Sequence, residues 1–252
     1  MKSSNPTLNQ KLIRDFTFQR TEAGVMTVQG TVNKIAVMLL LALAGAFFTW
    51  SKFFAAVESG AGTSSVMGWM IFGAIGGLVM ALITVFKKEK ASIFAPIYAV
   101  FEGLFIGAIS AFFESMYPGL VLRAVSLTFA VLFALLFAYK TRIIKVTDKL
   151  RAGIFAATAG IAVAYFASFI LGLFGINVGF MHGGGTIGIV ISLVIVVVAA
   201  LNLVLDFDFI EKGSEAGLPK YFEWYGAFGL MVTLIWLYLE ILRLLSYLTG
   251  RD

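Results

Sequence analysis

Long apolar blocks alternate with short polar segments along most of this chain. Each block has enough residues for a helix that crosses a bilayer, which takes about 20 apolar residues. The pattern therefore predicts an all-α integral membrane protein that forms a bundle of seven transmembrane helices. The predicted spans are residues 35–56, 65–86, 91–113, 120–139, 152–174, 187–210 and 225–248.

The segment before the first block is polar and of mixed charge. Residues 1–34 contain no apolar run long enough for the core of a signal peptide. We therefore expect residues 1–34 to be a cytoplasmic tail and residues 35–252 to be a single membrane domain.

Composition supports this class of protein and narrows the chemistry. The chain is 60% hydrophobic and 13% charged, with a mean hydropathy of +0.95, far from the soluble average of roughly 25% charged residues. It has no cysteine and a single histidine, His182, which excludes disulfides, thiolate nucleophiles and the common zinc sites. We expect no cofactor.

The positive charges are distributed unevenly between the two sets of connections. Fifteen of the 19 Lys and Arg residues lie in the tail or in the connections on the same side as the tail. Cytoplasmic loops are enriched in Lys and Arg, so we expect the amino terminus inside and the carboxyl terminus outside. We interpret the net charge of +5 as a topology signal and expect no nucleic-acid partner.

Small residues four positions apart predict places where helix backbones approach closely. Two pairs stand out, Gly73 with Gly77 and Ala156 with Gly160. We interpret both as packing between helices of the bundle.

Five charged residues inside the predicted spans stand out, because an ionised side chain there costs several kcal/mol unless it is paired or hydrated. They are Glu102, Arg123, Asp206, Glu240 and Arg243. Arg123 is close enough to a span end for its guanidinium to reach the interface. Glu102 is near the middle of its span and should face the bundle interior or a hydrated cavity.

Glu240 and Arg243 are three residues apart, which puts them on one helix face. One interpretation is a structural ion pair; the other is that Glu240 lines an ion path and Arg243 tunes its charge. Asp206 is the deepest acid of its span, whereas we expect Asp208 and Glu211 to be solvated.

Carboxyl groups in such surroundings can sense pH, carry protons or bind a hard cation. The residues alone leave these three roles open and do not identify a metal. Our candidates for an ion-pathway or pH-sensing site are Asp206, Glu240 and Glu102, with Arg243 as the residue that tunes their charge.

Motifs of catalysis and nucleotide binding are incomplete. Gly183, Gly185 and Gly188 match the spacing of a dinucleotide-binding loop, but no strand precedes them. The glycines after His182 lack the serine elbow of an esterase. We therefore expect that the protein is not an enzyme.

The last two spans resemble the closing region of the Bax inhibitor-1 family, in particular a bacterial branch. The resemblance lies in LNLVLDFDFIE at residues 201–211 and LMVTLIWLYLEILRLL at residues 230–245. It implies a seven-helix bundle with a central last helix in the bacterial inner membrane. It also implies a pH-sensitive calcium leak governed by two membrane-embedded aspartates, one of which matches Asp206, while Arg243 matches the family's late arginine.

The second aspartate of the family has no clean match. An ungapped match on Arg243 puts Thr233 at that position, whereas the local pattern LYLE would select Glu240. The two candidates are seven residues apart, hence about 10 Å along one helix face. The segment between the last two spans, residues 211–224, also looks longer than that of the family.

Three functions remain as hypotheses. The first is an ion pathway for Ca²⁺ or protons, gated by protonation of intramembrane carboxyl groups. The second is a regulator that binds another membrane protein, such as a quality-control protease, and moves no ions. The third is a proton-coupled carrier of a small solute, which we rank last because only Pro96 interrupts a span.

Overall fold

The structure is a computed structural model and describes residues 24–60, 64–175 and 185–250. Within these ranges it contains seven long helices, one 3-10 turn at Lys88–Lys90 and no strand. All seven helices are long and apolar enough to cross a membrane, which confirms the predicted fold class. The helices are α2 (Val28–Glu58), α3 (Ser64–Phe86), α4 (Ala91–Met116), α5 (Leu120–Lys140), α6 (Asp148–Leu173), α8 (Thr186–Glu215) and α9 (Phe222–Thr249).

Several helices extend beyond the apolar blocks into polar sequence. Helix α2 begins at Val28, where the Thr27 hydroxyl accepts a hydrogen bond from the Gly30 amide at 2.9 Å. Thr147 caps α6 in the same way, and such caps satisfy amides that have no partner within the helix. Residues 28–34, which we had assigned to the tail, therefore form the first turns of α2.

The connection between α8 and α9 is shorter than the sequence indicated. Helix α8 continues to Glu215 and α9 begins at Phe222, so only residues 216–221 join them. Polar residues at both ends of segment 211–224 are helical, so the connection itself is shorter than the gap between the two apolar blocks.

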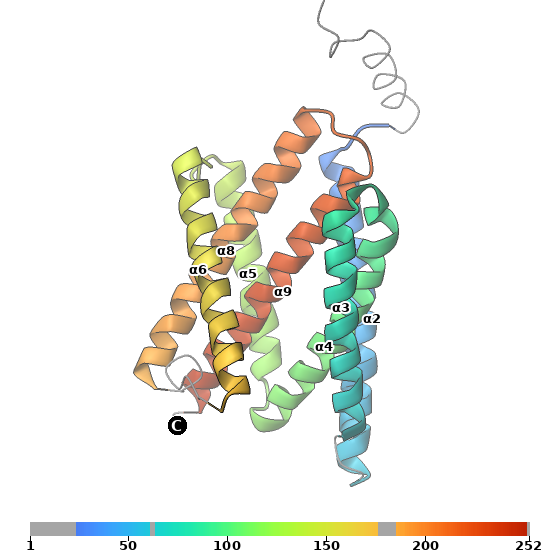
Figure 1. Cartoon of the computed structure of the whole chain (residues 1–252), viewed down its shortest axis with the longest axis vertical. Coiled ribbons are helices and arrows are strands. Elements are labelled where there is room, and N and C mark those ends of the chain that lie inside the picture. The colour runs from blue at the N-terminus through green and yellow to red at the C-terminus, as the bar shows by residue number, and fades with distance from the viewer. Residues whose placement is uncertain (1–23, 61–63, 176–184, 251–252) are drawn as a thin grey trace, which may run out of the picture.

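Helix α9 runs obliquely through the middle of the bundle, between a group formed by α2, α3 and α4 and a group formed by α5, α6 and α8 (Figure 1). It packs against α2, α4, α5 and α8. The largest apolar cluster includes Leu203 and Val204 of α8 with Leu237 and Leu242 of α9. The central last helix implied by the family resemblance is thus present.

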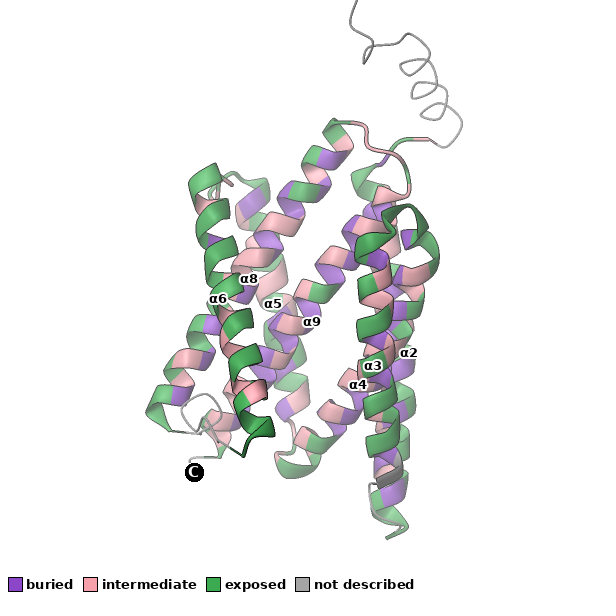
Figure 2. Ribbon diagram, viewed as in Figure 1, coloured by how far each residue is buried: buried purple, intermediate pink, exposed green. Residues whose placement is uncertain are grey.

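Burial differs strongly between helices (Figure 2). Helix α9 is lined with buried residues, whereas α6, all of which is described, has Ile154 as its one buried residue. Large side chains such as Phe155 and Phe166 project from α6 into the surroundings. A surface of this kind suits lipid chains, since lipid tails solvate apolar side chains.

Close packing through small residues occurs at one of the two predicted pairs. A β-carbon on Gly73 would lie 2.7 Å from the Phe101 carbonyl oxygen, so α3 and α4 touch backbone to backbone there. By contrast, no described atom lies within 4 Å of a β-carbon on Gly160, and Ala156 is exposed. The prediction for Ala156 and Gly160 is wrong, because α6 packs mainly on α8 through other positions.

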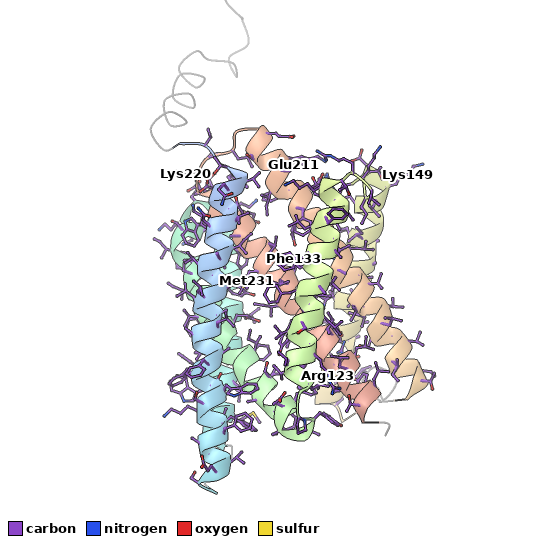
Figure 3. All side chains as sticks on the ribbon, turned by 180° about the vertical axis from the view of Figure 1, so that it is seen from behind. Arg123, Phe133, Lys149, Glu211, Lys220 and Met231 are labelled. Atoms are coloured by element: carbon purple, nitrogen blue, oxygen red, sulfur yellow. The ribbon has the colours of Figure 1, made fainter. Side chains whose placement is uncertain are left out.

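The positive residues collect at one end of the bundle. Lys149, Glu211 and Lys220 lie at this end, and Arg123 lies near the opposite end (Figure 3). The start of α2 and the connections α3–α4, α5–α6 and α8–α9 share this end. We call it the basic end.

Candidate functional site

Asp206 lies on α8, facing the central helix α9. Its Oδ1 atom is 3.7 Å from the position of a β-carbon on Gly229, and its carboxyl group is within reach of the Thr233 hydroxyl. Its Oδ2 atom is shielded from solvent and has no hydrogen-bond partner among the described residues. A buried oxygen without a partner is uncommon and costly.

Thr233, rather than Glu240, is therefore the residue of α9 that stands opposite Asp206. The Thr233 hydroxyl also donates to the Gly229 carbonyl oxygen at 3.3 Å, within its own helix. Glu240 lies two turns farther along α9, toward the end opposite the basic end. Thr233 is the position that the ungapped match on Arg243 assigns to the second acid of the family resemblance.

Glu240 is buried in a polar cluster of its own. The Tyr165 hydroxyl of α6 donates to Glu240 Oε1 at 2.8 Å, and the Trp236 indole donates to the same oxygen at 3.2 Å. Arg243 forms an ion pair with Glu240 Oε2 and donates to the Tyr165 hydroxyl. The predicted ion pair is present, and Tyr165 and Trp236 complete the cluster.

Glu102 lies between α3 and α4, away from both of these groups. A β-carbon on Gly77 would lie 2.8 Å from Glu102 Oε2, so the carboxyl group packs against bare backbone of α3. Within the described parts of the chain, no hydrogen bond or ion pair links Glu102 to Asp206 or Glu240. The structure thus separates the three predicted acids into three places.

Asp208 is buried, contrary to our expectation that it is solvated. Its Oδ2 accepts from Arg151 of α6 at 2.6 Å and from Lys212 of α8 at 2.8 Å. The two cations are about half exposed. Asp208 is buried because Arg151, 57 residues away in sequence, covers it.

Glu211 joins the α5–α6 connection to α8 at the basic end. Its carboxylate accepts from Arg142 at 2.9 Å and from the Tyr139 hydroxyl. The nearby Glu211 charge raises the pKa of Arg142 above the ordinary arginine value. Arg142 has a positive φ of 60°, a conformation that is uncommon outside glycine, and the ion pair holds it there.

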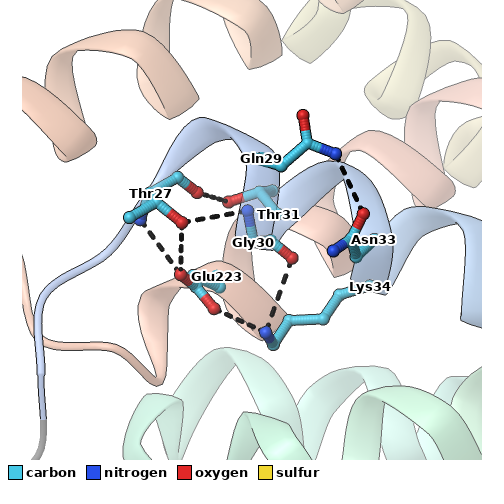
Figure 4. Close-up of polar contacts among 7 residues, drawn as sticks. All are labelled: Thr27, Gln29, Gly30, Thr31, Asn33, Lys34 and Glu223. Carbon is cyan, nitrogen blue, oxygen red and sulfur yellow. Dashed lines mark hydrogen bonds and ion pairs between the residues drawn. The ribbon is translucent and has the colours of Figure 1, made fainter.

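Glu223 ties the start of α9 to the start of α2 (Figure 4). It is 1% exposed, pairs with Lys34 at 2.5 Å, and accepts from the Thr27 amide at 3.0 Å and hydroxyl at 2.9 Å. A β-carbon on Gly30 would lie 2.1 Å from the Glu223 carboxylate, so a larger residue there would displace this carboxylate from its partners. This joint is absent from our sequence prediction, because its partners are about 190 residues apart.

Comparison with known families gives the chain its identity. A family model described as Bax inhibitor 1 like matches residues 5–250, nearly the whole chain. The chain belongs to the Bax inhibitor-1-like family. No curated protein and no solved structure matches it.

Within this Bax inhibitor-1-like protein, the Asp206 position differs electrostatically from the positions of Asp208, Glu223 and Glu240. Asp208, Glu223 and Glu240 each have a cationic partner, whereas none is found for Asp206 in the described residues. The described residues also contain no group of three or more His, Cys, Asp and Glu that could hold a metal ion.

Two further residues singled out from the sequence are Arg123 and His182. Arg123 is exposed near the start of α5, in line with a guanidinium that reaches the interface. His182 lies outside the described residues.

Tyr165 and Trp236 were missed as partners of Glu240. Trp236 is four residues from Glu240 on the same helix face, so it could have been found from the spacing. Tyr165 could not, because it lies on a different helix.

Proposed function

We propose that this protein forms a pH-gated ion pathway across a bacterial inner membrane, with the proton occupancy of Asp206 as its gate. Calcium is the ion that the family resemblance implies. The observation that carries the proposal is the Asp206 carboxyl group at the α8–α9 contact, with Oδ2 lacking a partner among the described residues. The other buried acids of these two helices are paired with cations.

The energetic argument rests on the cost of a charge in apolar surroundings. An ionised side chain in the bilayer core costs several kcal/mol unless it is paired or hydrated. A proton on Asp206 removes this cost in the packed arrangement. Protonation of Asp206 therefore changes the free-energy difference between the packed arrangement and a second arrangement in which water reaches α8 and α9. A change in this difference shifts the populations of the two arrangements.

The neighbouring polar clusters fix the elements around this gate. Glu223 and Glu240 hold the two ends of α9, and Asp208 holds the basic end of α8. With the basic end in the cytoplasm, as the positive-inside rule predicts, Asp206 lies nearer the cytoplasmic side than Glu240.

The test is a calcium flux assay on purified protein in liposomes loaded with a calcium dye. The wild type should leak calcium at a rate that depends on pH. Asp206→Asn, which keeps the shape and cannot ionise, should flatten this pH dependence to less than about a third of the wild-type range.

Glu215→Gln is the matched control, since Glu215 is exposed at the end of the same helix. It should retain the wild-type pH profile. A leak whose pH dependence survives Asp206→Asn would remove this residue from the gate, and the absence of any leak from wild-type vesicles would refute the ion pathway itself.

A second candidate function, a regulator that binds another membrane protein, is favoured by the exposed small residues of α6. Gly153 and Gly160 have open space around them among the described residues, and such positions allow a neighbouring helix to approach closely. A photo-crosslinker at Ala156 in native membranes that captures one partner stoichiometrically, together with vesicles that do not leak, would support this function over the first.

A further inference from the structure

An elongated apolar groove lies between α2, α4, α5 and α9. Its volume is about 450 Å³, within the range of about 300–1,000 Å³ that is typical of ligand pockets. On α2 its lining extends from Leu39 to Trp50, which is about 16 Å of helical rise. The groove therefore runs along the helices, from mid-bundle toward the end opposite the basic end.

The groove is open on the side where α2 faces α5. These two helices do not pack closely on each other in the described part of the chain, and Figure 3 shows α2 and α5 side by side, with side chains between them. Phe47 of α2 and Val125 of α5, which both line the groove, are 72% and 36% exposed. The opening faces the bilayer.

The lining of the groove is almost entirely apolar and uncharged. Tyr238 and Ser110 share a hydrogen bond of 2.6 Å, Ser110 donates to the Ile106 carbonyl oxygen, and Thr128 donates to the Ala124 carbonyl oxygen. No Lys, Arg, Asp, Glu or His is among the described residues that line it. A lining without charge, whose hydroxyl groups are already hydrogen-bonded, suits an apolar occupant better than an ion.

The dimensions decide which kind of occupant fits. A groove of this volume and length is narrower than a helix with its side chains, which is about 10–12 Å wide. It can hold an extended hydrocarbon chain along its length, and it is too narrow to enclose a helix of a partner protein. We propose that it is a binding site for the hydrocarbon chain of a bilayer lipid, seated against α9.

Quenching of tryptophan fluorescence by brominated lipid chains tests this site, because Trp50 lines the groove. Two reporters share Trp224→Phe and Trp236→Phe; one retains Trp50 and the other retains Trp69, which is exposed on α3. In vesicles of brominated phospholipid, Trp50 should be quenched at least as strongly as Trp69, although Trp50 is the less exposed of the two. Trp50 fluorescence that brominated chains leave unquenched would overturn the proposal.

Two variants of α5 check that the quenching comes from the groove. In the Trp50 reporter, Val125→Phe should fill the opening and reduce the extent of quenching by brominated phospholipid. Leu122→Phe adds comparable bulk at a position that is 73% exposed and does not line the groove, and should leave quenching unchanged. If Val125→Phe, eluting as a folded protein, leaves the Trp50 curve unchanged, the groove is not the binding site.

A second arm identifies the source of the chain. The same reporters are titrated with a brominated free fatty acid in vesicles of unlabelled phospholipid. Quenching of Trp50 by the phospholipid, by the fatty acid or by both supports the site and assigns the lipid class where Val125→Phe reduces it. If Val125→Phe reduces the quenching by neither, the site is refuted.

Discussion

At the scale of single residues, the partners of a buried acid determine whether its protonation can change or whether it only holds two helices together. Glu240 receives bonds from Tyr165, Trp236 and Arg243, so its charge is fully compensated. Removing one partner of such a group leaves the other charge buried and unpaired, which costs more than the pair itself contributes. We therefore assign Glu240 a structural role in closing the contact between α6 and α9.

Glu240→Gln should lower the free energy of unfolding in mixed micelles by about 2–3 kcal/mol, since Arg243 loses its counter-charge but is partly exposed. The double variant Glu240→Gln with Arg243→Met should lose about 1 kcal/mol less than the single variant, because no charge remains to be desolvated. If the double variant is no more stable than Glu240→Gln alone, the ion pair is not what holds this cluster together.

Sequence reasoning at this scale succeeds where contacts are local. The spacing of Glu240 and Arg243 on one helix was enough to predict their pair. The pairing of Asp208 with Arg151 was missed because it depends on how α6 docks on α8, which no spacing along the chain reveals. For the same reason, only the structure distinguishes Thr233 from Glu240 as the residue opposite Asp206.

At the scale of helices, backbone proximity replaces the hydrophobic effect as the source of packing, because lipid tails are as apolar as leucine. Helices α2 and α4 approach so closely that a β-carbon on Gly103 would lie 2.2 Å from the Ala42 carbonyl oxygen. Helix α6 has no such contact at Gly160. These two glycines therefore make different contributions to the fold.

Gly103→Ala should destabilise the protein by about 1–3 kcal/mol, because α2 and α4 must move apart to admit the methyl group. Gly160→Ala is the matched change in open space and should be neutral or stabilising by up to about 1 kcal/mol, through helix propensity. Thermal unfolding in detergent measures both. Equal effects at the two positions would contradict the close approach of α2 and α4.

The existence of all seven helices follows from apolar length, but their ends do not. Val28, Asp148 and Glu215 lie beyond the apolar blocks, where a polar turn is stabilised by capping and by ion pairs. Small-residue spacing predicted the contact at Gly73 correctly and failed at Gly160, because spacing does not tell which face of a helix meets the bundle and which meets lipid.

At the scale of the whole molecule, α6 is attached differently from the other helices. Polar contacts hold it at three depths: Arg151 to Asp208, Thr158 to Asn202, and Tyr165 to Glu240. Most of its apolar side chains are exposed. Asp206 lies on α8 between Asp208 and Asn202, the two residues of α8 that hold α6.

The most direct test of the central claim is an infrared titration of the purified protein in lipid, following the carbonyl stretch of protonated carboxyl groups against pH. The account predicts a component that titrates over the same pH range as the calcium leak, is lost in Asp206→Asn and is retained in Glu215→Gln. An identical carboxyl band in the wild type and Asp206→Asn at every pH would show that Asp206 does not exchange a proton and would contradict the account.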